Sequence, residues 1–237
     1  MTEQEIIKEL LNYDTPSVTN VVATYPGDKE LCLGLYEPWE SNWYTDDSLR
    51  CLYPELGRVA GYAVTCVFGT PSFGSNNLSF LDVLRAVGRS LRPVVLLVKN
   101  DFPERFKKKC AISGGNMSTA MKASGVVGVI SDGPTRDVDE VREIGLQYLV
   151  TGATAGHGEF TVKAINVPVS IAGMDVCPGE IVHMDENGAV KFPREHLGGA
   201  LERLKKLIEI EKIRMGKMRD ATNVEDVIKI LSDFKEA

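Results

Sequence analysis

Apolar residues follow two different spacings along the chain, and the spacings change from segment to segment. A repeat of three to four residues is typical of an amphipathic helix, whereas a short apolar run or a strict alternation is typical of a strand. The first spacing predicts helices over residues 3–12, 13–25, 79–90, 115–125, 137–145, 194–218 and 224–237. The second predicts strands over residues 58–69, 92–100, 126–133 and 146–152, followed by an alternating segment over 160–193.

Short apolar strands that alternate with helices predict a largely parallel sheet assembled from βαβ units. The alternating segment 160–193 contains turn residues at Gly173, at Pro178-Gly179 and at Glu186-Asn187-Gly188, and it predicts an antiparallel β-meander. Residues 27–57 are rich in aromatic and turn residues and predict an irregular connection. The fold class is therefore α/β, with a mostly parallel sheet, an antiparallel ribbon and helical additions at both ends.

The composition narrows the possible classes of protein. A length of 237 residues suits one sizeable domain, and 25% charged residues with a net charge of −6 are typical of a soluble globular protein. The acidic balance argues against nucleic acid as a partner, since the basic run Lys107–Lys109 is too short for such a surface. The acidic first ten residues do not resemble a signal peptide, and no apolar run is long enough to span a bilayer. We expect a cytoplasmic protein without a membrane partner.

The thiol and imidazole side chains show no metal-binding spacing. The five cysteines form no Cys-x-x-Cys pair, which predicts reduced and mostly buried thiols, and the three histidines do not form a His-Glu-x-x-His motif. A bound metal would therefore need oxygen ligands, and such ligands favour Mg²⁺ or Mn²⁺.

Two glycine-containing turns each connect a predicted strand to a helix. They are Ser113–Met117 and Ser131–Asp137. Free backbone N–H groups and the helix dipole make such a turn suited to an anion, and ligands of parallel sheets bind at the carboxyl ends of the strands. The alternative is that Gly114 and Gly115 only permit a tight turn with positive φ. A third glycine-rich stretch, residues 151–160, matches neither a Walker A loop nor Gly-x-Gly-x-x-Gly and is interpreted as a flexible loop.

Arg136 and Asp137 are adjacent at the start of the predicted helix 137–145. A guanidinium binds a carboxylate with two parallel hydrogen bonds, and a carboxylate can hold a hard divalent cation that polarises a carbonyl. The pair could therefore bind a 2-oxo acid. The alternative is structural, because Asp137 with Glu140 has the spacing of a capping box and Gly145 is a suitable helix end.

The stretches "GGNMSTAMKASGVVGVISDGPTRDVDEVREIGLQYLVTG" and "INVPVSIAGMDVCPGEIVHMDENGAV" resemble the family of 4-hydroxy-4-methyl-2-oxoglutarate aldolases and regulators of ribonuclease E activity. The resemblance extends from about Gly57 to Pro193. It implies a swivelling α/β/β domain that assembles as a homotrimer or homohexamer. It also implies release of pyruvate from 4-hydroxy-2-oxo acids and decarboxylation of oxaloacetate, with Mg²⁺ or Mn²⁺.

The resemblance also implies roles for individual residues. Arg136 would bind the carboxylate of a small 2-oxo acid substrate, and Asp137 would reach the metal, so both are candidate catalytic residues. The pyruvate end would contact backbone groups of Gly114, Gly115, Asn116 and Met117. The similar part of the chain suggests a core over residues 57–205, preceded by N-terminal helices and an irregular segment over 1–56 and followed by a helical tail over 206–237.

One position departs from the family pattern. Aldolases of this family commonly carry an acidic residue at the place of Gly115, which could move a proton during aldol cleavage. We therefore expect decarboxylation to be faster than aldol cleavage, and Gly115→Asp to raise the aldolase rate. The alternative function is a regulatory binding protein of the ribonuclease E inhibitor type without catalysis, which would not need Arg136 and Asp137.

Overall fold

The computed structural model describes residues 1–23, 30–71 and 78–233. Its helices are α1 (Glu3–Leu10), α2 (Thr15–Val22), α3 (Phe80–Arg89), α4 (Glu104–Lys107), α5 (Gly115–Ala123), α6 (Val138–Ile144), α7 (Leu197–Arg219) and α8 (Val224–Asp233), with short 3-10 turns at η1 (Pro54–Leu56) and η2 (Arg194–His196). Its strands are β1 (Arg50–Cys51), β2 (Val59–Gly69), β3 (Val94–Asp101), β4 (Val126–Ser131), β5 (Gln147–Val150), β6 (Thr161–Ile165), β7 (Val169–Ile171), β8 (Met174–Val176), β9 (Ile181–Asp185) and β10 (Gly188–Phe192).

Four parallel strands form the centre of the main sheet, in the order β5-β4-β3-β2. The residues of β3 alternate between two apolar environments. Val94, Leu96 and Val98 pack in the cluster under the helices, whereas Val95 and Leu97 pack in a second cluster against β7 and β8. A strand buried on both faces has a continuous apolar run, which is why this segment was predictable as a parallel strand.

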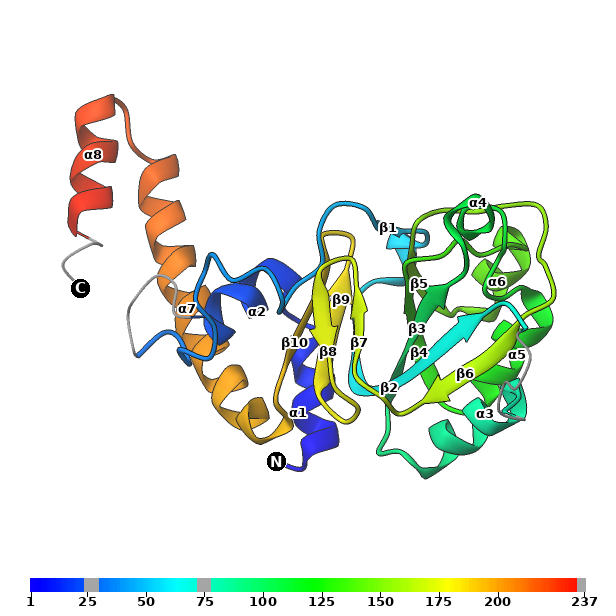
Figure 1. Ribbon diagram of the computed structural model, residues 1–237. Coiled ribbons are helices and arrows are strands. Elements are labelled where there is room, and N and C mark those ends of the chain that lie inside the picture. The colour runs from blue at the N-terminus through cyan, green and yellow to red at the C-terminus, as the bar shows by residue number, and fades with distance from the viewer. Residues whose placement is uncertain (24–29, 72–77, 234–237) are drawn as a thin grey trace.

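Helices and a hairpin cover the two faces of this sheet (Figure 1). Helices α3, α5 and α6 contribute apolar side chains to the first cluster, and the β7–β8 hairpin covers the opposite face. The three layers are therefore helix, sheet and hairpin. This arrangement confirms the predicted α/β/β class with helical additions.

The antiparallel part differs from the predicted continuous meander. β6 pairs with the end of β2, β9 pairs with the beginning of β2, and β7 with β8 forms a separate two-stranded sheet. The predicted turn Glu186-Asn187 does join β9 to β10. Alternation in a sequence determines which face a residue occupies but carries no information about the neighbouring strand, and so the meander was wrong.

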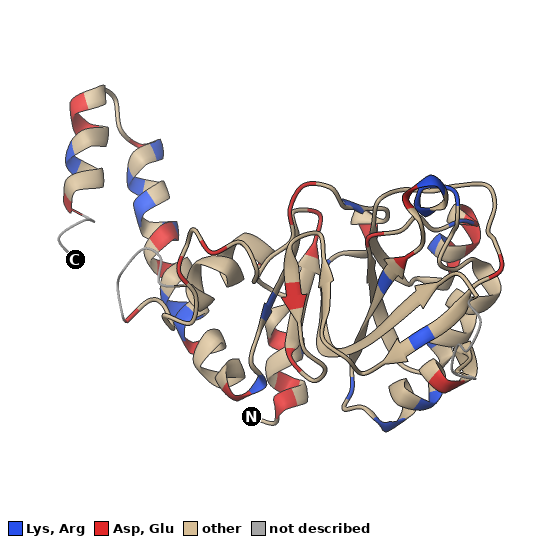
Figure 2. Ribbon diagram, viewed as in Figure 1, with Lys and Arg blue, Asp and Glu red and all other residues tan. Residues whose placement is uncertain are grey.

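The terminal helices form a third apolar cluster. α1 and α2 both pack against α7, while α1 also contacts β2 and α2 contacts the β9–β10 hairpin. Leu10, Val18 and Leu204 are fully buried in this cluster. Beyond this contact α7 and α8 extend away from the sheet, and both signs of charge alternate along α7 (Figures 1 and 2). Within the described part of the chain, no helix has the length and apolar character needed to cross a bilayer.

Several element boundaries differ from the predicted ones. The helix predicted over 13–25 ends at Val22, and its residues 24 and 25 lie outside the described residues, as do residues 234–237 of the last predicted helix. Helix α4 was not predicted from the sequence. The division at residues 57 and 205 stays a prediction, and α7 is continuous across the second of these boundaries.

The thiols agree with the prediction of reduced and mostly buried cysteines. All five are free, and Cys32, Cys66 and Cys110 are buried. Burial raises the pKa of the Cys66 thiol well above its ordinary value.

A buried histidine connects α2 to the β9–β10 hairpin. His183 is fully buried, and its Nδ1 lies 2.9 Å from the Thr15 hydroxyl oxygen. Asp185, also buried, accepts a hydrogen bond of 2.7 Å from the Thr15 N–H. Burial lowers the pKa of His183 to about 4, although the Asp185 carboxylate opposes this effect. His183 therefore stays neutral where a histidine in the unfolded chain would already be charged.

This difference predicts a pH-dependent stability. The folded-state pKa lies below the ordinary value of 6.5, so the contribution is complete above about pH 6.5 and is lost as the pH falls toward 4. At about 1.4 kcal/mol per pKa unit, the loss is on the order of 3 kcal/mol. Urea unfolding at pH 7 and pH 4.5 should show a smaller loss for His183→Gln than for the wild type. Equal losses in the two proteins would contradict this assignment.

Candidate functional site

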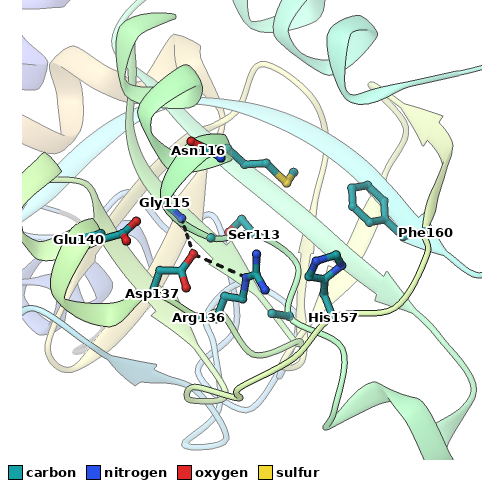
Figure 3. A pocket seen from close by; sticks show the side chains of 11 residues that line it. Ser113, Gly115, Asn116, Arg136, Asp137, Glu140, His157 and Phe160 are labelled. Atoms are coloured by element: carbon teal, nitrogen blue, oxygen red, sulfur yellow. Dashed lines mark hydrogen bonds and ion pairs between the residues drawn. The ribbon is translucent and has the colours of Figure 1, made fainter.

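A cavity of about 310 Å³ lies where three loops leave the carboxyl ends of the parallel strands. The loops follow β3, β4 and β5. The cavity is lined by Ala111, Ser113, Gly114, Gly115, Asn116, Met117, Arg136, Asp137, Glu140, His157 and Phe160 (Figure 3). The structure thus brings together all six site residues that the sequence analysis selected, as expected for ligand sites in parallel sheets.

The two glycines are required by close approach and not by φ. Gly114 has a φ of −142°, and Gly115 is not among the residues with positive φ, so the interpretation as a positive-φ turn is wrong. A Cβ on Gly114 would collide with Asp137 Oδ2 and would lie 2.8 Å from Arg136 Nε. A Cβ on Gly115 would collide with Glu140 Oε2. Helix α5 therefore begins directly against three charged side chains.

Asp137 does not cap its own helix. Its side chain makes no capping hydrogen bond in α6, and its backbone is left-handed, with φ of 57° and ψ of 47°. The carboxylate instead accepts a hydrogen bond of 2.9 Å from the Gly115 N–H, at the start of α5 (Figure 3). The capping-box interpretation of Asp137 is therefore wrong, whereas Gly145 does end α6 in the left-handed conformation.

Arg136 lies beside Asp137, and a backbone hydrogen bond holds it in place. Its N–H donates to the Ser113 carbonyl over 3.2 Å, and its Nε lies 3.6 Å from Asp137 Oδ2. The side chain is about one third exposed, at 35%. Because the contact with Asp137 is made through Nε, the two terminal nitrogens of the guanidinium can form a bidentate contact with a ligand carboxylate.

The first turn of α5 also contributes to the cavity through its backbone. The first N–H groups of a helix have no acceptor within the helix, and the helix dipole makes this end attractive to negative charge. In α5 the Gly115 N–H is satisfied by Asp137, while Asn116 and Met117 follow it in the same turn and line the cavity. Their N–H groups are suited to an anionic ligand.

A network of buried hydroxyl groups holds the two loops in place. The Tyr148 hydroxyl lies 2.8 Å from Ser113 Oγ and 2.9 Å from Ser118 Oγ, and Ser118 Oγ donates to the Gly114 carbonyl over 2.8 Å. Thr135 Oγ1 donates to the Ser113 carbonyl over 3.0 Å. Burial raises the pKa of Tyr148, so its hydroxyl stays neutral. The network ties the start of α5 to β5 and to the loop that carries Arg136.

Two titratable residues of the cavity were not selected from the sequence. Glu140 comes from α6, and His157 comes from the glycine-rich stretch 151–160, which had been interpreted only as a flexible loop. That loop is attached to the preceding connection, since Ala111 N–H donates to the Gly156 carbonyl over 3.1 Å. The sequence did contain one indication that residues 151–160 reach the cavity: they follow a predicted parallel strand, as the other two loops of the cavity do.

The described residues contain no group of three or more His, Cys, Asp or Glu side chains placed to hold a metal. The cavity does contain Asp137 and Glu140, and Asp137 Oδ1 has no partner among the described residues. Mg²⁺ keeps several waters and is commonly held by only one or two carboxylates. The Oδ1 atom of Asp137 is thus suited to bind a hard divalent cation that keeps several of its waters.

The family described as RraA-like, Aldolase/RraA, matches residues 38–191. Since this match covers more than half of the chain, the chain belongs to that family. The resemblance noted in the sequence is thereby confirmed.

Two relatives are similar to part of the chain. An uncharacterized protein of Methanocaldococcus jannaschii is 32% identical over 126 residues, which cover 50% of this chain and 61% of that protein. A Thermus thermophilus protein named 4-hydroxy-4-methyl-2-oxoglutarate aldolase is 31% identical over 96 residues, which cover 38% of this chain and 56% of that protein. The chain spans less than two thirds of the length of each relative.

Solved structures support the fold. An uncharacterized protein of Pseudomonas syringae pv. tomato superimposes with a TM-score of 0.72 at 19% identity, covering 95% of this chain and 93% of the other. Streptomyces coelicolor RraAS2, described as an unusual member of the RNase ES inhibitor RraA protein family, superimposes with a TM-score of 0.62 at 23% identity, covering 88% and 94%. At these identities the likeness establishes the fold alone.

The close approach at Gly114 predicts that Gly114→Ala disturbs ligand binding and leaves the fold intact. The backbone at Gly114 suits alanine, but the added Cβ must displace Arg136 and Asp137. Binding of oxalate, a small dicarboxylate probe, should weaken by at least tenfold, or about 1.4 kcal/mol. Isothermal titration calorimetry measures this change.

Gly88→Ala in α3 is the matched control, because no atom lies within 4 Å of a Cβ at that position. It should leave oxalate binding unchanged and stabilise the helix by about 0.5–1 kcal/mol. If Gly114→Ala binds oxalate as the wild type does, the described packing of Arg136 and Asp137 against Gly114 is incorrect.

Proposed function

We propose that this member of the RraA-like family is a divalent-metal-dependent lyase for 2-oxo acids. It releases pyruvate by retro-aldol cleavage of 4-hydroxy-2-oxo acids, by decarboxylation of oxaloacetate, or by both. One observation carries the proposal: a guanidinium, a carboxylate and the first turn of a helix meet in one cavity at the carboxyl ends of parallel strands. The aldolase name of several relatives supports it.

Arg136 would bind the C1 carboxylate of the substrate. Its Nε is directed to Asp137, and its terminal nitrogens present the planar pair of donors that a carboxylate accepts. The N–H groups of Asn116 and Met117 would receive negative charge on the neighbouring keto oxygen. Donors placed where charge develops during the reaction are commonly the largest contribution to catalysis.

Asp137 would hold the divalent cation. When bound, Mg²⁺ or Mn²⁺ would supply Lewis-acid stabilisation of negative charge at the keto oxygen. The Gly115 N–H fixes one carboxylate oxygen of Asp137 and leaves the other available. One carboxylate oxygen of Asp137 would thus bind the metal, while the other holds the side chain in position.

Both reactions break the bond between C3 and C4 of the substrate. In decarboxylation the C4 carboxylate leaves as carbon dioxide, and the bonding electrons form the enolate of pyruvate. In retro-aldol cleavage the C4 hydroxyl loses its proton, C4 becomes a carbonyl, and the same enolate results. Protonation at C3 completes either reaction, so the residues that bind the pyruvate end serve both.

The alternative is a regulatory binding protein of the ribonuclease E inhibitor type, in keeping with the description of RraAS2. Such a protein would not require Arg136 and Asp137 to converge on a cavity, and therefore the geometry favours the enzyme. Assembly as a homotrimer or homohexamer stays a prediction, as do the cytoplasmic location and the lack of a nucleic-acid partner.

Removal of divalent cations should abolish pyruvate release. Exhaustive chelation should stop turnover of oxaloacetate and of 4-hydroxy-4-methyl-2-oxoglutarate, and added Mg²⁺ or Mn²⁺ should restore it, since the cavity offers oxygen ligands. A coupled assay of pyruvate measures both rates, with the spontaneous decay of oxaloacetate subtracted. Full activity after chelation would refute the metal requirement.

Arg136→Lys should lose far more activity than a surface substitution. A lysine ammonium cannot reproduce two parallel hydrogen bonds, so the expected loss is on the order of 2–5 kcal/mol in kcat/KM. The loss should appear mainly in KM if Arg136 binds the substrate carboxylate in the ground state. Arg142→Lys on the exposed side of α6 is the control, and equal activity of the two variants would contradict the assignment.

Asp137→Asn tests the negative charge of this side chain separately from its hydrogen bond to the Gly115 N–H. Asparagine tolerates the left-handed backbone and can still accept the Gly115 N–H bond, so the free energy of unfolding should change by less than about 1 kcal/mol. The loss of the charge should nevertheless abolish metal-dependent activity. Wild-type turnover by this variant would show that Asp137 has only a structural role.

A further inference from the structure

A second space, the apolar recess, lies beside the cavity that contains the Arg-Asp pair. It measures about 280 Å³ and is lined in part by Phe102, Phe106, Cys110 and residues 156–159. His157 lines both spaces, and the consecutive residues Cys110 and Ala111 line one each. The recess and the cavity are therefore neighbours that share a wall.

Aromatic side chains determine the character of the recess. Phe102 is 7% exposed, whereas Phe106 on α4 is 44% exposed although its ring is apolar. Exposed apolar side chains around a concave space are typical of a ligand-binding site. Among the described residues of the lining, Lys109 and Glu159 carry opposite charges, which leaves no excess of positive charge for a second carboxylate. The recess therefore suits an uncharged, apolar group.

Two hydrogen bonds hold the loop that forms the shared wall. The Gly158 N–H donates to Cys110 Sγ over 3.2 Å, and the Ala111 N–H donates to the Gly156 carbonyl over 3.1 Å. These bonds attach the loop on both sides of His157 to the segment that precedes α5. Because the protein itself fixes this wall, binding against it costs less conformational entropy.

The charged groups of the cavity determine which part of a substrate reaches the recess. In Figure 3, Asp137 lies on one side of Arg136, and His157 lies on the other. The carboxylate and the keto oxygen of a 2-oxo acid would be held at Arg136 and at a cation on Asp137. The group carried by C4 would then extend away from the cation, toward His157 and the recess.

We propose that the apolar recess binds an aromatic ring carried by C4 of the substrate, an inference that rests on the proposed lyase function. The substrate class is then the 4-aryl-4-hydroxy-2-oxo acids. An apolar cavity of about 150 Å³ is large enough for benzene, so a space of about 280 Å³ accepts a single ring. In retro-aldol cleavage the C4 hydroxyl loses its proton, the C3–C4 bond breaks and C3 takes up a proton. The products are pyruvate and an aromatic aldehyde.

Two unreactive 2-oxo acids test the recess without turnover. 2-Oxo-4-phenylbutanoate carries the ring at C4 but lacks the hydroxyl that cleavage requires, and 2-oxobutanoate is the same acid without the ring. Both are titrated calorimetrically into the wild type in the presence of Mg²⁺. The phenyl compound should bind about 10–100-fold more tightly, the gain that burial of one aromatic side chain commonly supplies.

Two variants alter the recess in different ways. Phe106→Ala removes a half-exposed ring, and Gly158→Leu fills part of the space. The backbone of Gly158 is not left-handed, and a Cβ there would lie 3.7 Å from Cys110 Sγ, which is an ordinary contact. Each variant should remove most of the preference for the phenyl compound and leave the affinity for 2-oxobutanoate unchanged. Leu81→Ala, an exposed position of α3 outside the recess, is the matched control and should retain the full preference.

Turnover should follow the same order. The kcat/KM for 4-hydroxy-2-oxo-4-phenylbutanoate should exceed that for 4-hydroxy-2-oxopentanoate, which carries a methyl group at C4, by at least about tenfold. Phe106→Ala should abolish this difference. A coupled assay of pyruvate measures both rates.

The outcomes separate the recess from the proposed function. Equal affinities of the wild type for the two unreactive acids would overturn the inference, even if other 4-hydroxy-2-oxo acids release pyruvate. A phenyl preference that persists in both Phe106→Ala and Gly158→Leu would place the ring outside the recess and would overturn it as well. A wild type that releases pyruvate from no 4-hydroxy-2-oxo acid and not from oxaloacetate would refute the lyase, and the substrate class with it, while calorimetry would still decide whether the recess binds the ring.

Discussion

The hydrogen bond from the Gly115 N–H to the Asp137 carboxylate is the contact on which the cavity depends. It joins the start of α5 to the loop that precedes α6, two segments that are 22 residues apart in the sequence. A Cβ at position 114 would meet the same Asp137 oxygen and Arg136, and a Cβ at position 115 would meet Glu140. Gly114 and Gly115 thus define the space in which the charged groups converge.

The sheet supplies the framework for this contact. Parallel strands bring their carboxyl ends to one edge, so the loops after β3, β4 and β5 meet without any specific attraction between them. The hydroxyl groups of Ser113, Ser118 and Tyr148 then connect the loop before α5 to β5 in the core. Each hydroxyl is buried and bonded, and removal of one would leave its partners unsatisfied, which is more costly than the bond itself is stabilising. The position of Gly114 is therefore determined by the core and not by the ligand.

Local patterns explain how much could be predicted. The predicted helix 115–125 is observed as Gly115–Ala123, and the predicted strand 126–133 as Val126–Ser131, because both depend on spacing within one segment. The partners of β6 and β9 depend on contacts across the chain, which alternation does not encode. The same limit applies to the site: Arg136 and Asp137 were identified as an adjacent pair, whereas Glu140 and His157 become recognisable only when α6 and the loop after β5 are placed beside α5.

The left-handed backbone of Asp137 gives a physical reason for the adjacent Arg-Asp pair. A non-glycine residue with φ of 57° is held in a conformation that costs on the order of 1 kcal/mol, and such residues cluster at functional sites. In the usual capping conformation the carboxylate would face the N–H groups of its own helix. The left-handed turn directs it toward α5 instead and leaves Arg136 Nε beside it. One strained residue thereby places a guanidinium and a carboxylate side by side in a single cavity, and neither orientation would follow from a regular helix start.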